Sequence, residues 1–183
     1  MNTIYFVRHA HSYYTPDEYN RPLSKEGWVE AQKLVKVFGA LEIHAIYASN
    51  YKRAIETIQP IASEKNLTII QKETLNERIL ATETISDFLS GIAKVWAEPT
   101  FSFAGGESNI TAQKRVIPTI AKLLNCHKNE NIVVGTHGNI LTLLLNYFDK
   151  QYDIEFWQSL KMPDIIVAKF ANNKLISVER LIY

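Results

Sequence analysis

Five side chains of this sequence could together transfer a phosphoryl group: Arg8, His9, Arg53, Glu77 and His137. Arginine keeps its charge at any working pH, and its planar fork of N–H donors matches phosphate oxygens. A neutral imidazole beside two guanidinium groups could attack phosphorus and form a phosphohistidine, and the nearby positive charge disfavours the imidazolium. One carboxyl group could then protonate the departing alkoxide and later deprotonate the attacking water.

These side chains follow short apolar runs whose composition predicts strands. The runs cover residues 4–7, 45–48, 67–70 and 132–134. Between them, apolar residues recur at helical spacing after the expected helix starts Ser24, Ser49, Ser108 and Gly138. Strands that alternate with helices predict a largely parallel sheet covered on both faces. Ligands of such sheets bind beyond the carboxyl ends of the strands, so we expect the five side chains to converge there.

The remainder of the chain predicts a closing hairpin and an insertion. Residues 165–170 and 175–178 flank Asn172-Asn173 and suggest two antiparallel strands. Residues 82–98 have weak helical character, and Pro60 is expected to bend or shorten the helix that follows Ser49. We therefore predict a single domain over residues 1–183, with a three-layer α/β/α fold and a lid-like insertion around residues 80–107.

Composition narrows the possible partners. The 183 residues carry a formal net charge of +1, so no global field would hold nucleic acid or an anionic membrane. The single cysteine, Cys126, cannot form an intramolecular disulfide and fits a reducing compartment. No apolar stretch approaches the roughly 18 residues of a membrane span. We expect a cytoplasmic protein whose partner is a small phosphorylated metabolite, and the oligomeric state stays open.

Five ordered segments carry the residues singled out above: Val7 to Ser12, Ser49 to Thr57, Leu75-Asn76-Glu77, Gly106-Glu107-Ser108 and Thr136-His137-Gly138. In content and order they resemble the histidine phosphatase (phosphoglycerate mutase-like) superfamily, and Asn20 to Gly27 is similar to the start of that family's first helix. The resemblance implies that His9 is the phosphorylated nucleophile and Glu77 the proton donor. It also implies a phosphate pocket of Arg8, Arg53 and His137, and a reaction that needs neither a metal nor a cofactor.

Some positions depart from the family pattern or allow two roles. Ala10 stands where the family usually has glycine, and Thr15 where mutase-type members often have an asparagine that binds phosphate. Thr15 and the short chain both favour a phosphatase over a mutase. Ser12 is either a phosphate ligand or a hydrogen-bonding group of its loop. The helix start at Gly138 would add backbone N–H donors for phosphate.

Three other functions remain as alternatives. The same residues could support mutase-type transfer of a phosphoryl group between phosphoglycerates. The pair His9-x-His11 could belong to a metal-dependent hydrolase, although zinc sites usually need a third ligand nearby. The protein could also bind phosphate without turnover. Substrate choice is expected to depend on the tyrosine-rich loop around Tyr13-Tyr14 and on residues 82–106, whose aromatic side chains either rim the pocket or pack a lid against the body.

Overall fold

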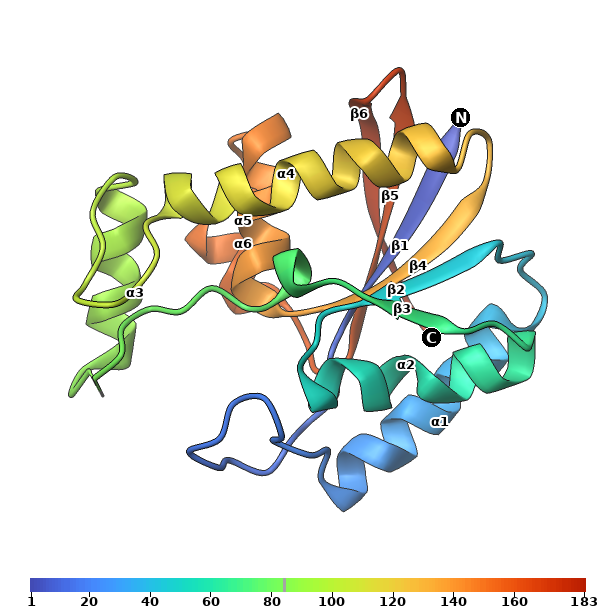
Figure 1. The fold of residues 1–183 in the computed structure, drawn as a ribbon, viewed down its shortest axis with the longest axis horizontal. Coiled ribbons are helices and arrows are strands. Elements are labelled where there is room, and N and C mark those ends of the chain that lie inside the picture. The colour runs from blue at the N-terminus through green and yellow to red at the C-terminus, as the bar shows by residue number, and fades with distance from the viewer. Residues whose placement is uncertain (84) are drawn as a thin grey trace.

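A six-stranded sheet crosses the middle of the protein in a computed structural model that describes residues 1–83 and 85–183 (Figure 1). The strands are β1 (Asn2–Arg8), β2 (Ala45–Ala48), β3 (Ile69–Gln71), β4 (Asn131–Thr136), β5 (Asp164–Ala171) and β6 (Lys174–Leu181). Their spatial order is β3-β2-β4-β1-β5-β6. The first four are parallel, and β5 and β6 form an antiparallel hairpin beside β1. The predicted parallel sheet with its C-terminal hairpin is confirmed.

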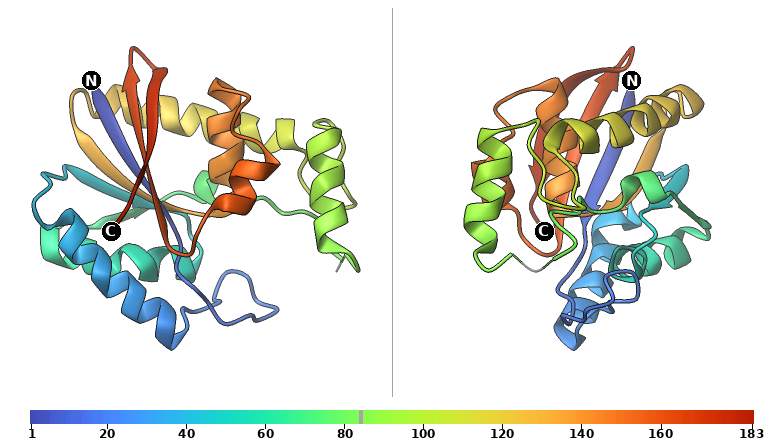
Figure 2. Two further views of the ribbon diagram at one scale, coloured as in Figure 1. Left: turned by 180° about the vertical axis from the view of Figure 1, so that it is seen from behind. Right: turned by 60° about the vertical axis from the view of Figure 1, so that its left-hand side comes forward.

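Helices cover both faces of this sheet (Figures 1 and 2). The helices are α1 (Lys25–Gly39), α2 (Lys52–Lys65), α3 (Phe88–Ala97), α4 (Asn109–Cys126), α5 (Gly138–Phe148) and α6 (Ile154–Ser159), with a 3₁₀ turn at Glu73–Leu75. Side chains of β1 alternate between the two sides, as a pleated strand requires. Tyr5 and Val7 face the core beneath α1 and α2, whereas Ile4 and Phe6 face the core beneath α4 and α5.

The helices begin where the sequence predicts, with one exception. Ser24 caps α1 by accepting a hydrogen bond from the Gly27 N–H at 3.0 Å, and Ser108 caps α4 in the same way. The helix expected from Ser49 begins instead at Lys52. Pro60 does not end this helix early, since α2 continues to Lys65. The Pro60 ring is buried in the helix–sheet core, whose packing offsets the missing N–H.

The segment predicted as an insertion leaves the body after Glu77 and carries α3 (Figure 1). Its helix is shorter than the expected 82–98, because Asp87 caps it by accepting from the Ser90 N–H at 3.0 Å. Thr84 lies outside the described residues. The two ends of the segment are joined by a hydrogen bond from the Glu107 N–H to the Ile79 carbonyl at 2.8 Å. Within the described ranges, no helix combines the length and apolar character needed to cross a bilayer.

Candidate active site

The ends of β1, β2 and β4 bring the two predicted histidines together. The His9 N–H donates to the Thr136 carbonyl, and the Ser49 N–H to the Gly135 carbonyl, each at 3.0 Å. The parallel ladder therefore extends past the last residues of the strands. The imidazole rings of His9 and His137 meet edge to face, with 5.3 Å between their centroids.

His9 is held as a neutral imidazole with one orientation. Its Nδ1 lies 2.8 Å from its neighbour Ala10's carbonyl oxygen, which can only accept, so Nδ1 carries the proton and Nε2 keeps a lone pair. Burial and the positive charge of Arg53 lower the pKa of His9 to about 3. The methyl group of Ala10 replaces the family's glycine without strain, because Ala10 does not have positive φ and packs against Leu23 and Ala31.

His137 is fully buried beneath His9. Its Nε2 lies 2.7 Å from the Ser49 hydroxyl, whereas its Nδ1 has no hydrogen-bond partner in the described part of the chain. Burial and the charge of Arg53 hold the pKa of His137 well below its usual value. Ser49, which sequence reasoning assigned to a helix start, thus orients this ring instead. The ring of Tyr51 supports His137 from another side, at 5.1 Å between centroids.

Arg53 lies in the first turn of α2, close to the two histidines, and is almost completely buried. Its guanidinium lies 4.7 Å from the centre of the Tyr51 ring. Glu18, from the loop between β1 and α1, binds both terminal nitrogens of Arg53: the carboxylate at 3.0 Å and the backbone carbonyl at 2.9 Å. An anionic side chain therefore occupies part of the predicted phosphate clamp.

A further arginine, Arg21, joins this clamp and was not singled out from the sequence. It lies 3.1 Å from the other carboxylate oxygen of Glu18 and donates from Nε to the Ser12 hydroxyl at 3.0 Å. Ser12 thus has the loop hydrogen bond that was one of its two predicted roles. Thr15 makes a local bond to the Asp17 carbonyl. The segment Asn20 to Gly27 contained the signal for Arg21, but only as part of a helix start.

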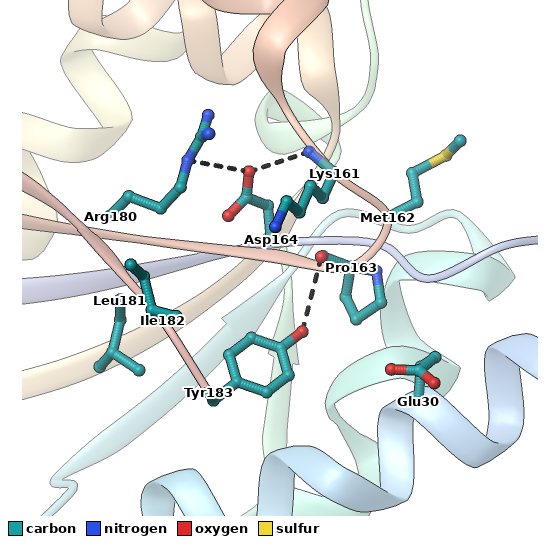
Figure 3. A pocket seen from close by; sticks show the side chains of 9 residues that line it. All are labelled: Glu30, Lys161, Met162, Pro163, Asp164, Arg180, Leu181, Ile182 and Tyr183. Carbon is teal, nitrogen blue, oxygen red and sulfur yellow. Dashed lines mark hydrogen bonds and ion pairs between the residues drawn. The ribbon is translucent and has the colours of Figure 1, made fainter.

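Arg8 reaches the site from the end of β1. Its Nη1 donates to the Leu160 carbonyl at 2.7 Å. The loop that carries Leu160 is pinned by the buried Asp164, which lies opposite Arg8 in the β1–β5 pairing and accepts from the Lys161 N–H at 2.9 Å. Figure 3 shows Asp164 between Lys161 and Arg180, whose Nε lies 3.3 Å away. Asp164 therefore holds the loop that positions Arg8.

Gly138 sits where Arg8 approaches the start of α5. A Cβ atom at this position would lie 3.1 Å from both Cζ of Arg8 and Nε1 of Trp157. The absence of a side chain at Gly138 lets the guanidinium and the indole approach the α5 backbone. Trp157 was not predicted as a site residue, because α6 is a six-residue helix without a repeated apolar pattern.

Glu77 lies on the N-terminus of α5. Its Oε2 accepts from the Asn139 N–H at 3.0 Å, and its Oε1 accepts from the N–H groups of Ile140 and Arg78, each at 2.8 Å. Two of the N–H donors that were expected to serve phosphate thus bind this carboxylate. A carboxylate oxygen has two acceptor sites, so Oε1 is saturated, and Oε2 keeps one site for a proton.

Arg78, also missed from the sequence, supports Glu77 from within the protein. Its guanidinium is buried and donates to Asn109 Oδ1 at 3.0 Å and to Asn139 Oδ1 at 3.4 Å. These asparagines begin α4 and α5, so Arg78 ties the backbone beside Glu77 to two helix starts. Only the full fold brings these three segments together, which is why no local pattern marked Arg78.

The residues considered for a metal site have other partners. His9 Nδ1 bonds to the Ala10 carbonyl, and His11 Nδ1 lies 2.8 Å from the Ser24 hydroxyl. Across residues 1–83 and 85–183, no three His, Cys, Asp or Glu side chains are grouped so as to hold a metal ion.

This chain is similar to known proteins over most of its length. Residues 4–174 match the model of the histidine phosphatase superfamily (branch 1). Phosphoserine phosphatase 1 of Hydrogenobacter thermophilus is 28% identical over 150 residues, covering 75% of this chain and 71% of the relative. A 2,3-bisphosphoglycerate-dependent phosphoglycerate mutase of Parvibaculum lavamentivorans is 29% identical over 181 residues, covering 81% of this chain and 80% of the relative.

A solved structure with a similar fold is a mycobacterial glucosyl-3-phosphoglycerate phosphatase in complex with inorganic phosphate. It superposes with a TM-score of 0.79 and 18% sequence identity, covering 100% of this chain and 97% of that one. With the match to the family model over nearly the whole chain, and with that family's motifs gathered at one edge of the sheet, the protein belongs to the histidine phosphatase superfamily.

Proposed function

We propose that this protein is a phosphomonoester hydrolase that acts through a phosphohistidine at His9 and needs no metal ion. The observation that carries the proposal is the fixed tautomer of His9, whose Nδ1–H donates to the Ala10 carbonyl and leaves Nε2 unprotonated beside Arg53 and His137. A small phosphorylated metabolite is the expected substrate. Its phosphoryl dianion would replace the Glu18 carboxylate at Arg53.

In the first step, Nε2 of His9 forms a bond to phosphorus as the bond from phosphorus to the ester oxygen breaks. The alcohol leaves with a proton from the Glu77 carboxyl group, and we assign that proton to Oε2, which has an acceptor site left. Arg8, Arg53 and the Nδ1–H of His137 would stabilise the charge on the phosphoryl oxygens. Both Arg53 and His137 have buried nitrogens without a partner among the described residues, which supports this role.

In the second step, the Glu77 carboxylate takes a proton from water as the water oxygen forms a bond to phosphorus. The P–N bond breaks, its electron pair returns to Nε2, and phosphate leaves. Gly138 would contribute by keeping the start of α5 close to Arg8, and Ser12 by holding Arg21.

Turnover of an aryl phosphate in the presence of a chelator tests this proposal. We expect His9→Ala to abolish turnover, and acid-labile phosphate to be trapped on the wild-type protein but not on the variant. Turnover by His9→Ala at the wild-type rate would contradict the phosphohistidine. Loss of activity with a chelator and recovery with zinc would contradict metal independence.

Mutase activity is the second candidate, because a phosphoglycerate mutase is among the relatives. Interconversion of 2- and 3-phosphoglycerate at a rate above their hydrolysis would favour it. Hydrolysis without interconversion would favour the phosphatase.

A further inference from the structure

Two aromatic side chains, Trp157 and Phe88, form a surface next to Arg8. The indole nitrogen of Trp157 and the guanidinium of Arg8 lie close together beside Gly138. Each is 3.1 Å from the position that a Cβ atom would take at this glycine. The ring of Phe88, at the start of α3, faces Trp157 with 6.4 Å between ring centroids. Phe88 is 51% exposed although it is a large apolar residue. A group attached to a phosphate at Arg8 would therefore lie against Trp157 and Phe88.

Other large apolar side chains near these residues in the sequence are also exposed. Ile79, two residues after Glu77, is exposed, as is Leu89 next to Phe88. The ring of Tyr19 contacts that of Tyr51, with 4.8 Å between their centroids, and Tyr51 in turn contacts His137. Exposed aromatic surface therefore also adjoins the site through Tyr19, which comes from the loop between β1 and α1.

Basic side chains are scarce in the segment that carries Phe88. Residues 79–106 contain one basic side chain, Lys94, against three acidic ones. Lys94 lies over the Phe101 ring at 4.2 Å, so it packs within the segment. The segment beside Trp157 therefore offers an apolar ring, and no cluster of basic side chains, to a group attached to the phosphate.

From this we infer that the site prefers phosphate monoesters of ring-bearing apolar alcohols to phosphate esters of small polar alcohols. The inference rests on the proposed function and narrows its substrate class. Trp157 and Phe88 supply the surface for the apolar group, and burial of part of a ring against them would favour such esters roughly tenfold or more.

The test compares kcat/KM for 1-naphthyl phosphate, ethyl phosphate, phosphoserine and 3-phosphoglycerate. We expect 1-naphthyl phosphate to exceed phosphoserine and 3-phosphoglycerate at least tenfold. Phe88→Ala should lower its kcat/KM about five- to tenfold, mainly through KM, and leave ethyl phosphate within twofold. Ile176→Ala, at an exposed apolar residue of β6, is the matched control and should change neither value.

The possible outcomes separate this inference from the proposed function. His9-dependent turnover that favours phosphoserine or 3-phosphoglycerate, or that Phe88→Ala does not affect, would overturn the inference and leave the phosphatase intact. If no ester is hydrolysed, the proposed function fails, and calorimetry with the His9→Ala protein decides the inference. Tighter binding of 1-naphthyl phosphate than of phosphoserine supports it, and equal or weaker binding overturns it.

Discussion

The carboxylate of Glu18 lies 3.0 Å from the guanidinium of Arg53, in the position that the proposed mechanism gives to the substrate's phosphoryl group. Arg21 binds the other oxygen of the same carboxylate at 3.1 Å. The loop between β1 and α1 thus neutralises the arginine clamp with an internal anion. A phosphate that binds at Arg53 as proposed would have to displace this side chain.

Glu18→Gln should therefore bind phosphate more tightly than the wild type. The Glu18 side chain is 46% exposed, so its ion pairs are those of a surface group, and we expect a two- to fivefold gain in affinity. Isothermal titration with inorganic phosphate measures it. Asp17→Asn is the control, because Asp17 is the neighbouring acid but bonds to Asn20. Unchanged or weaker binding by Glu18→Gln would show that this carboxylate does not compete with phosphate.

Gly138→Ala should impair catalysis without unfolding the protein. The added methyl group would lie 3.1 Å from Arg8 Cζ, so the guanidinium must move by a few tenths of an ångström. Misplacing a group that binds the transferred phosphoryl by this amount is expected to lower kcat/KM roughly tenfold. Gly39→Ala is the matched control, because nothing lies within 4 Å of its added methyl group. It should keep full activity, and equal kcat/KM for both variants would refute the steric role of Gly138.

Asp164→Ala should destabilise the protein and weaken the hold on Arg8. Asp164 is buried and binds both Arg180 and the Lys161 N–H, so its removal breaks an ion pair and a hydrogen bond made by a buried carboxylate. We expect the free energy of unfolding in urea to fall by about 2–3 kcal/mol, together with a higher KM for any phosphate ester. Glu179→Ala, on the exposed side of β6, should cost less than about 0.5 kcal/mol. A similar loss in both variants would contradict the assigned role.

The strands and helices along the chain could be predicted from the sequence, because apolar runs and helical spacing are local patterns. For the same reason, Arg8, His9, Arg53, Glu77 and His137 could be placed together, since each follows a strand end or opens the next helix. Glu18, Arg21, Arg78 and Trp157 could not. Their contacts depend on how the loop after β1, the asparagines of two helix starts and the short α6 meet in space, and no spacing in the sequence records that.

Acid should destabilise the native state through His9. Burial beside Arg53 lowers its pKa to about 3, whereas an unfolded histidine titrates near 6.5. Below pH 6.5 the unfolded chain binds a proton that the folded chain does not, so the contribution is complete above pH 6.5 and is lost as the pH falls toward 3. The wild type should lose roughly 1 kcal/mol of stability per pH unit in this range that His9→Gln does not lose.

Urea unfolding at pH 7.5 and pH 5.0 measures this difference. His44→Gln, at an exposed histidine of the loop before β2, serves as the control and should follow the wild type. Parallel acid curves for wild type and His9→Gln would mean that the His9 imidazole is protonated in the folded protein at pH 5.

The hydrogen bond between Glu107 and Ile79 closes the α3 segment at its base, and a second one, from the Thr82 N–H to the Ala104 carbonyl at 3.1 Å, lies just above it. The segment leaves and rejoins the body at nearly one point. A change in the length or sequence of this segment need not disturb the hydrogen bonds between Glu77 and the start of α5. Replacement of this one segment is thus a way to alter the surface next to the site while the strand ends that carry His9 and His137 stay as they are.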